Sequence, residues 1–154
     1  MIMNKFKAWK IREIGSIVSL CLWLSSCEPD LQDHDIPIIT FPPLTINVNL
    51  PEYQQLRSNG VQEISGVGIK GVILYRLHES RYFAYERNCS FQPHDACAVV
   101  SLDPSNLFMR DACCNSTFDF QTGSPTGGPA WRPLRKYETT VNGSIITITS
   151  NIVD

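Results

Sequence analysis

The stretch from Tyr137 to Thr149 reads Tyr-Glu-Thr-Thr-Val-Asn-Gly-Ser-Ile-Ile-Thr-Ile-Thr. On both sides of Asn142-Gly143 the residue pattern has a period near two, which is typical of a strand with one buried face. Asn-Gly between two such runs is a strong hairpin signal, because both central positions of its turn adopt positive φ. The stretch therefore predicts an antiparallel hairpin over 137–141 and 144–149.

Other parts of the chain repeat this pattern. Short runs predict strands at 45–50, 72–77, 82–86, 98–102, 107–110 and 117–120. The turn at 78–81 joins the second and third of these runs into another hairpin. No window of a dozen residues keeps the 3.6-residue period of a helix, so we expect little helix outside the N-terminal segment. The predicted fold class is all-β, an antiparallel sandwich or barrel-like domain.

The segment Gly66-Val67-Gly68-Ile69-Lys70-Gly71 matches the dinucleotide-binding pattern G-x-G-x-x-G. Such a site needs a strand before the glycines and a helix after them, so that pyrophosphate meets the N-terminus of the helix. Here a predicted strand follows the glycines. We therefore interpret them as turn or bulge positions.

The first 27 residues have the layout of a secretory signal. A basic stretch from Lys5 to Arg12 precedes an apolar run from Ile14 to Leu24, which is shorter than the roughly 20 residues of a membrane-spanning helix. The sequence Leu24-Ser25-Ser26-Cys27 resembles the lipobox of bacterial lipoproteins, in which the cysteine is lipidated. The resemblance implies a lipid anchor on Cys27 and a location in the bacterial cell envelope, at the outer membrane on its periplasmic or surface face. The alternative is an ordinary cleaved signal or an uncleaved anchor.

We divide the chain into a signal peptide at 1–26, the lipidated cysteine with a flexible tether at 27–43, and a β domain at 44–154. The tether alternates acidic residues with prolines and has no apolar period. Such a composition cannot bury enough surface to offset the entropy lost on ordering.

The charge balance argues against nucleic-acid binding. Four of the 13 bases and one of the 15 acids lie before Cys27, which leaves nine bases against fourteen acids in the rest of the chain. Neutralising phosphates requires clustered lysine and arginine, and the chain has no basic stripe. No nucleophile–base pair or carboxylate pair stands out either, so we do not expect an enzyme. The expected partners are a membrane, through the anchor, and an envelope protein.

Four cysteines follow Cys27, namely Cys89, Cys97, Cys113 and Cys114. An even number in an exported domain indicates disulfides. Three pairings are possible, and the one that joins the adjacent Cys113 and Cys114 closes a strained ring. Pairing between the first two and the last two cysteines is therefore preferred, and spacing alone goes no further.

Three segments between residues 86 and 137 form a recognisable pattern. The first begins Cys89-Ser90-Phe91, the second reads Asp-Ala-Cys-Cys-Asn-Ser-Thr-Phe-Asp over 111–119, and the third contains Gly128-Pro129-Ala130. Together they resemble a Rieske domain, in which two tip loops of an all-β fold hold a two-iron, two-sulfur cluster through a Cys and a His each. The family's first loop begins Cys-x-His. Its second loop runs Cys-Pro-Cys-His-Gly-Ser-x-Phe-Asp in members with a loop-bridging disulfide.

The resemblance implies a Rieske-like fold with two Cys-bearing tip loops and an altered set of ligands. It places Cys89 and Asp111 at the family's two Cys ligand positions, and Phe91 and Cys114 at its two His positions. Phe91 has no lone pair, and a carboxylate is a poor substitute for thiolate on this iron. We therefore expect no metal and no cofactor here. The alternative is a 2Fe-2S cluster with unusual ligands, either all-thiolate or with His94 as a nitrogen donor.

The same resemblance implies how the cysteines pair. Cys97 and Cys113 take the positions of the loop-bridging disulfide, which leaves Cys89 and Cys114 for a second bridge. A chain exported unfolded into an oxidising compartment has its thiols oxidised, and the signal lacks the twin arginine that exports proteins with cofactors already inserted. Both features favour two disulfides over a cluster.

Three functions follow from these patterns. The first is a lipid-anchored, cluster-free Rieske-like domain with a binding or structural role in the envelope. The second is an electron-transfer protein with an unusual 2Fe-2S cluster. The third is a thiol–disulfide redox protein that uses Cys113 and Cys114, although the chain has no Cys-x-x-Cys motif. The first is our prediction.

Overall fold

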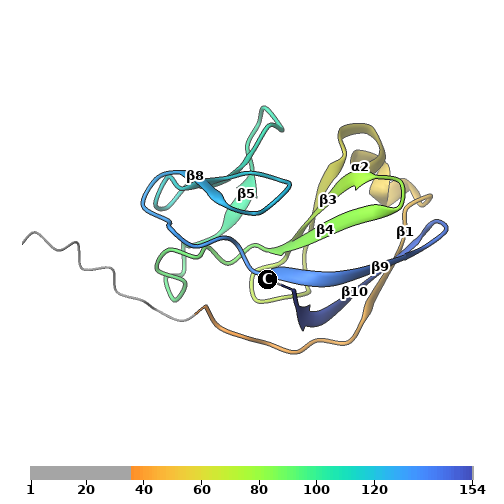
Figure 1. Cartoon of the computed structure of the whole chain (residues 1–154), viewed down its shortest axis with the longest axis horizontal. Coiled ribbons are helices and arrows are strands. Elements are labelled where there is room, and N and C mark those ends of the chain that lie inside the picture. Colours follow the sequence, from red (N-terminus) through yellow and green to blue (C-terminus); the bar gives the residue numbers. More distant parts are fainter. Residues whose placement is uncertain (1–35, 154) are drawn as a thin grey trace, which may run out of the picture. The chain divides into compact units, whose positions relative to one another are not determined.

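The computed structural model describes residues 36–153, so the predicted signal peptide, Cys27 and the tether up to residue 35 lie outside the described residues. The described chain forms two antiparallel sheets, which confirms the predicted all-β class (Figure 1). The six-stranded sheet contains, in spatial order, β1 (Leu44–Asn47), β10 (Ile145–Ile152), β9 (Lys136–Asn142), β4 (Arg81–Glu86), β3 (Val72–His78) and β2 (Val61–Ile64). The four-stranded sheet contains β5 (Val100–Leu102), β6 (Met109–Asp111), β7 (Thr117–Phe118) and β8 (Pro125–Gly127). None of the helices in the described part is long and apolar enough to cross a membrane.

The predicted hairpins form, and one of them turns one residue later than expected. β3 and β4 pair over nearly their whole length, from Val72 opposite Glu86 to His78 opposite Arg81. In the C-terminal hairpin Asn142 pairs with Ile145, so Gly143 and Ser144 make the turn. Gly143 has φ +59°, which fits the first central position of a type II′ turn.

Two strands and one helix were not predicted from the sequence. β2 and β8 are short, and β8 contains Pro125 and Gly127. The predicted strand at 45–50 ends at Asn47, because the Leu50 amide donates to the Asn47 carbonyl at 3.1 Å and turns the chain. A 3₁₀ turn, η1 (Pro51–Tyr53), and the helix α2 (Gln54–Asn59) follow directly.

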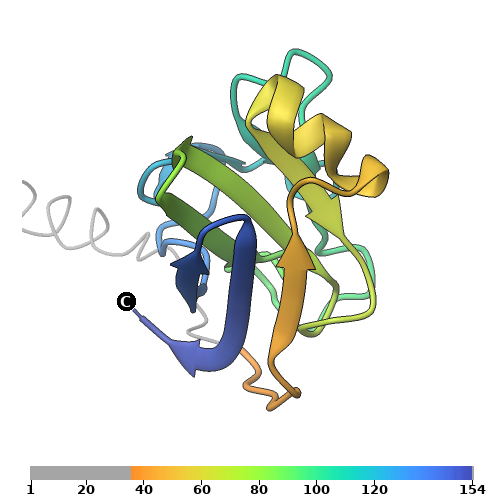
Figure 2. The same cartoon turned by 90° about the vertical axis from the view of Figure 1, so that its right-hand side faces the viewer.

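The six-stranded sheet curls around its own core, and α2 lies against one end of it (Figure 2). This core contains Ile46, Leu56, Leu74, Tyr82, Ala84, Tyr137, Ile146 and Ile148, all nearly or fully buried. The opposite faces of β3 and β4 are buried as well, because Ile73 and Tyr85 pack in the second core with residues of the small sheet. Burial of both faces explains the unbroken apolar run at 72–74, where a half-exposed strand would alternate.

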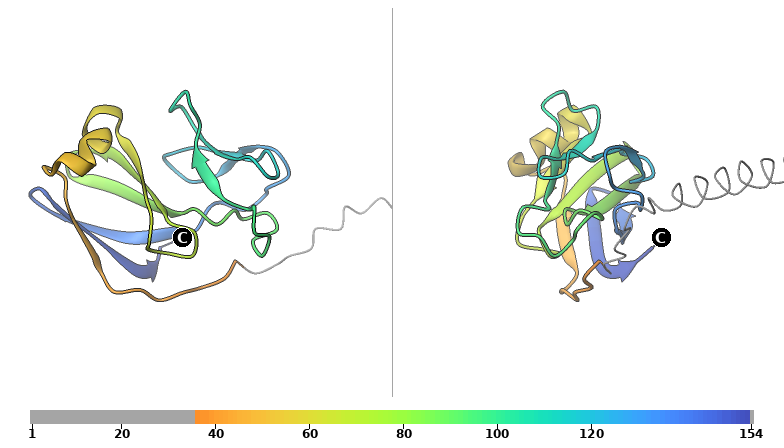
Figure 3. Two further views of the ribbon diagram at one scale, coloured as in Figure 1. Left: turned by 180° about the vertical axis from the view of Figure 1, so that it is seen from behind. Right: turned by 90° about the vertical axis from the view of Figure 1, so that its left-hand side faces the viewer.

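The small sheet is an insertion between two neighbouring strands of the large sheet. The chain leaves β4 after Glu86 and returns at Lys136 in β9, which pairs with β4. Figures 1 and 3 show the small sheet beside the large one from opposite sides. The second core between them contains Val100, Met109 and Phe118 from the small sheet. All four described cysteines lie in this insertion, so the large sheet serves as its base.

The glycine-rich segment at 66–71 binds a carboxylate of the protein itself. Glu86 is fully buried, and its Oε2 and Oε1 accept the amides of Ile69 (2.7 Å) and Lys70 (3.0 Å). Oε1 also accepts the Asn88 amide at 3.0 Å, and Oε2 accepts the Tyr137 hydroxyl at 2.8 Å. A Cβ on Gly68 would lie 2.4 Å from Oε2, so only glycine lets the backbone come this close. The predicted turn conformation of these glycines is confirmed.

Two buried tyrosines give a matched pair of variants. We expect Tyr137→Phe to lower the free energy of unfolding by about 2 kcal/mol, because it removes the hydroxyl that donates to buried Glu86. Tyr85→Phe should be neutral or stabilising, since the Tyr85 hydroxyl is buried without a hydrogen-bond partner among the described residues. Urea unfolding of both variants measures the difference. Equal losses would contradict the assignment of the carboxylate's partners.

Candidate functional site

The four described cysteines lie on two loops, and backbone hydrogen bonds hold the two ends of each loop together. Loop 1 (residues 89–98) begins and ends at a bridge between Asn88 and Val99, and the Cys89 amide donates to the Ala98 carbonyl at 3.1 Å. Loop 2 (residues 111–116) connects β6 to β7, and the Asp111 amide donates to the Ser116 carbonyl at 2.9 Å. These short closures hold the side chains of both loops in fixed directions.

A disulfide joins the two loops, as the sequence predicts. Cys97 and Cys113 are bonded, with an S–S distance of 2.02 Å. A second set of contacts that holds loop 1 in place was not predicted from the sequence. The Lys70 ammonium donates to the carbonyls of Asp95 (2.5 Å), Ala96 (3.3 Å) and Ala98 (3.2 Å), and so fixes loop 1 to the glycine-rich segment. A lysine within a glycine-rich run was the only sequence signal for this contact.

Loop 3 (residues 128–132) packs against the other two. The Ser116 hydroxyl accepts the Ala130 amide at 3.0 Å, and the Ser90 hydroxyl donates to the Arg132 carbonyl at 2.6 Å. A Cβ on Gly128 would lie 2.5 Å from the Ser116 Cα, so loop 3 can approach loop 2 only with glycine at this position. The third segment of the motif thus packs against both Cys-bearing loops.

Three of the four residues at the predicted cluster positions converge. The ligating atoms of Cys89, Asp111 and Cys114 all lie within 4.8 Å of one another. Cys114 Sγ lies 3.9 Å from Cys89 Sγ and 3.4 Å from Asp111 Oδ2. The fourth residue, Phe91, is half-buried and packs against the second core. His94, the alternative nitrogen donor, is exposed on loop 1 and is not a member of this group.

The predicted second disulfide is not formed in this structure. Cys89 and Cys114 are both free thiols, and their sulfur atoms are in contact at 3.9 Å, well beyond the roughly 2.05 Å of a disulfide. The Cys114 thiol is engaged elsewhere, because it lies 3.0 Å from the Ser116 hydroxyl as well as 3.4 Å from the Asp111 carboxylate. The spacing of cysteines in the sequence could not reveal these competing partners.

The environment of Cys89 keeps its thiol protonated. Cys89 is fully buried. Burial raises the pKa of the Cys89 thiol strongly, and the hydrogen bond with the Asp111 carboxylate raises it further. Because the thiolate is the nucleophile in thiol exchange, a raised pKa makes this cysteine unreactive as a free group. It can act as a metal ligand only if a cation displaces its proton.

Comparison with known proteins finds distant similarity to solved structures only. No protein-family model and no curated protein matches the sequence. A solved structure similar to this chain is the plasma-membrane Rieske protein PetC3 from Synechocystis PCC 6803, with a TM-score of 0.48 and 23% identity over 62% of this chain and 92% of the neighbour. The ferredoxin of carbazole 1,9a-dioxygenase from Nocardioides aromaticivorans IC177 has a TM-score of 0.42 and 22% identity, over 62% and 89%. A chain of the oxygenase–ferredoxin complex of carbazole 1,9a-dioxygenase has a TM-score of 0.47 and 18% identity, over 66% and 90%.

The neighbours are Rieske and ferredoxin domains. The Rieske-like arrangement expected from the motifs is present in the chain itself, with two antiparallel sheets, two Cys-bearing tip loops and the bridging disulfide. The residues at the tip of the Rieske-like domain differ from the ligand set expected of a Rieske centre, so its function depends on its own side chains.

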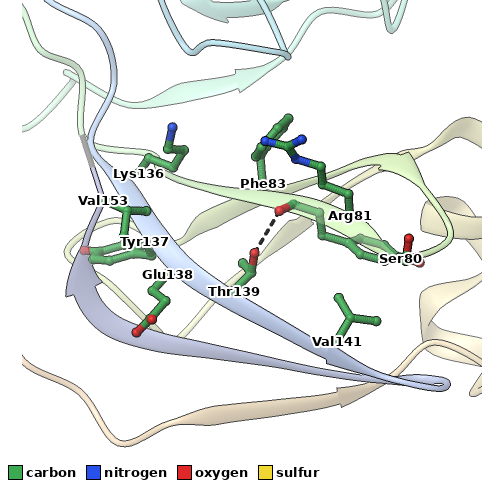
Figure 4. A pocket seen from close by; sticks show the side chains of 10 residues that line it. Ser80, Arg81, Phe83, Lys136, Tyr137, Glu138, Thr139, Val141 and Val153 are labelled. Atoms are coloured by element: carbon green, nitrogen blue, oxygen red, sulfur yellow. Dashed lines mark hydrogen bonds between the residues drawn. The ribbon is translucent and has the colours of Figure 1, made fainter.

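The Rieske-like domain also has a hollow of about 380 Å³ on the large sheet, lined mainly by β4 and β9 (Figure 4). Arg81 and Lys136 both lie against the Phe83 ring, 5.4 and 5.7 Å from its centroid. The Thr139 hydroxyl at its floor donates to the Tyr82 carbonyl at 2.8 Å. The polar groups of the hollow thus have partners within the protein, and none of the four described cysteines lines it. The tip loops remain the candidate site.

Proposed function

We propose that this chain is a lipid-anchored component of the bacterial cell envelope, and that its Rieske-like domain serves a binding or structural role without a 2Fe-2S cluster. The observation that carries the proposal is the position of Phe91. A cluster with two irons needs two protein donors on each iron. Where the fourth donor would be required, the domain has an aromatic ring packed against its apolar core.

The remaining donors do not fit a two-iron cluster either. In the alignment with the Rieske motif, Cys89 and Cys114 would bind different irons. Donors on different irons must be separated by the width of the iron–sulfide core. The sulfur atoms of Cys89 and Cys114 are instead in contact at 3.9 Å, which leaves no room for that core between them. The disulfide joins the two loops without metal, and the Lys70 contacts fix loop 1 to the glycine-rich segment.

A reconstitution experiment tests the absence of a cluster. The full chain, exported and purified without oxygen, is incubated with iron and sulfide, and acid-labile sulfide and the visible spectrum are measured. We expect no cluster in the natural chain. The triple variant Phe91→His/Asp111→Cys/Cys114→His restores the ligand types of the family and should gain one. A cluster in the natural chain would contradict the proposal and favour electron transfer.

The lipid anchor is tested separately. We expect Cys27→Ser to move the protein from the membrane fraction to the soluble fraction, because Cys27 is the residue of the lipobox that carries the lipid. Cys21→Ser is the matched control, since Cys21 lies within the predicted signal peptide and should leave the fractionation unchanged. The measurement is incorporation of labelled fatty acid together with fractionation. Labelling of the Cys27→Ser chain would refute the anchor assignment.

The thiol–disulfide alternative is less well supported. Cys113 is bonded to Cys97 instead of being paired with its neighbour Cys114. Cys89 is buried with a raised pKa, which opposes nucleophilic attack. A binding or structural role therefore fits the tip loops best.

A further inference from the structure

We infer that Cys89, Asp111 and Cys114 form a binding site for a single divalent cation of the zinc class, with solvent as the fourth ligand. The inference rests on the proposed function, because it concerns a domain without a two-iron cluster. One tetrahedral ion needs only a small group of donors, and soft thiolates together with a carboxylate are ligands that zinc accepts. Three protein ligands and one open position are a common coordination of this ion.

Two of the three distances between the donor atoms match one ion, and the third, between Cys89 and Asp111, is within 4.8 Å. Two thiolates at about 2.3 Å from a tetrahedral centre lie roughly 3.8 Å apart. Cys89 Sγ and Cys114 Sγ are 3.9 Å apart. A thiolate and a carboxylate oxygen on the same tetrahedral ion lie roughly 3.6 Å apart, from metal–ligand lengths of about 2.3 and 2.1 Å. Cys114 Sγ and Asp111 Oδ2 are 3.4 Å apart.

The carboxylate of Asp111 is oriented for this role. Its Oδ1 accepts the Cys113 amide at 2.7 Å, which directs Oδ2 toward the two thiols. Cys113 is itself fixed by the disulfide to loop 1. Hydrogen bonds of this kind from outside the ligand set orient metal ligands and strengthen binding. The disulfide thus positions a ligand in addition to joining the loops.

The charge of Asp111 provides a second argument. Asp111 is fully buried, and the observed partners of its side chain are neutral groups, among them the Cys113 amide and the Cys114 thiol. A buried carboxylate without a cationic partner is costly, and a bound cation supplies that partner. Binding replaces the protons of the two thiols, so one divalent ion enters and two protons leave. The site with two thiolates and one carboxylate then carries a net charge of −1.

Cobalt is the probe for this site, because cobalt–thiolate bonds absorb in the near ultraviolet and four-coordinate cobalt absorbs in the visible region. The full chain is stripped of metal with a chelator, its two free thiols are confirmed in denaturant, and Co²⁺ is added without oxygen. We expect one ion per chain, both absorption features, and displacement by Zn²⁺. Calorimetry in two buffers of different ionisation enthalpy should show release of two protons per ion.

Variants identify the ligands. Cys114→Ser should remove much of the thiolate absorption. Asp111→Asn should weaken binding by at least about 100-fold, because it removes a ligand and even partners outside the ligand set contribute roughly 10–100-fold. Asp95→Asn is the matched control, because Asp95 is an exposed acid on loop 1 outside the donor group, and it should bind as the natural chain does. Circular dichroism confirms that each variant is folded.

The outcomes separate this inference from the proposed function. Two free thiols without cobalt absorption, or unchanged binding in Cys114→Ser and Asp111→Asn, would overturn the single-ion site. A natural chain with no free thiols would also overturn it, and would leave the cluster-free function standing. A native chain that contains two irons and two sulfides would overturn both.

Discussion

Replacing Glu86 with glutamine is expected to lower the free energy of unfolding by about 3 kcal/mol. Four donors converge on this buried carboxylate, two on each oxygen. A glutamine amide offers one oxygen and one NH₂ group. The glutamine amide can lie in either of two flipped orientations. The more favourable one keeps the oxygen toward the amides of Lys70 and Asn88 and turns the NH₂ group toward Ile69 and Tyr137. The Tyr137 hydroxyl can then rotate to accept, but the Ile69 amide loses its acceptor inside the protein.

Glu138→Gln is the matched control for Glu86→Gln. Glu138 is half-buried in β9, and its Oε2 accepts from the side chains of Thr149 (3.1 Å) and Asn151 (2.8 Å) near the surface. We expect this change to cost less than about 1 kcal/mol. Urea unfolding measures both variants. If the two losses are equal, Glu86 does not organise the glycine-rich segment.

Alanine substitutions at two glycines of this segment distinguish the cost of a steric clash from the cost of a positive φ. Gly66 and Gly68 have similar positive φ values, +79° and +72°, so alanine at either position carries a similar conformational cost. A Cβ on Gly66 would have no atom within 4 Å, whereas one on Gly68 would lie 2.4 Å from Glu86 Oε2. We therefore expect Gly68→Ala to destabilise the domain more than Gly66→Ala. Equal costs would mean that the carboxylate can move away freely.

The second large effect is expected from Cys97→Ser. The disulfide between Cys97 and Cys113 spans 16 residues, and a loop of this length corresponds to about 3 kcal/mol of stability. Losing it should lower the unfolding midpoint in urea under non-reducing conditions. Both cysteines are exposed, so a reductant should reach the bond and lower the stability of the natural chain by a similar amount.

The control for the disulfide is Cys114→Ser in the presence of a chelator. Cys114 is a free thiol, so this variant should keep both the stability and the reductant sensitivity of the natural chain. Cys97→Ser, in contrast, should no longer respond to reductant. A Cys97→Ser chain that unfolds at the natural midpoint, or that still responds to reductant, would mean that the cysteines pair differently.

The sequence predicted those strands whose pattern is local. The hairpin of β3 and β4 was placed within one or two residues, because a long apolar run and an explicit turn lie side by side in the chain. β2 and β8 were missed, since strands of four and three residues carry too little periodicity, and β8 includes a proline and a glycine. The exact turn of the C-terminal hairpin depends on which residues pair, and the Asn-Gly signal does not specify that register.

The sequence predicted which residues belong to the candidate site, but it did not predict how their side chains are bonded. The motif placed four residues at the tip, and three of them, Cys89, Asp111 and Cys114, do converge, whereas Phe91 packs against the second core. The motif also paired Cys97 with Cys113. It also implied a bond between Cys89 and Cys114, which the structure does not contain. The role of Glu86 could not be predicted from the sequence, for a different reason. Its partners at 69 and 70 lie 16 or 17 residues earlier, and only the fold brings them around the carboxylate.

The native and denatured masses of the exported full chain, purified without oxygen or reductant, show directly whether the tip loops hold one ion or a 2Fe-2S cluster. The lipid contributes equally to both masses, so their difference reports only what the folded chain binds. We expect a denatured chain with one disulfide, lighter than the reduced chain by two hydrogens, and a native excess that matches a single divalent ion. A native excess that matches two irons and two sulfides would contradict this expectation and establish a 2Fe-2S protein.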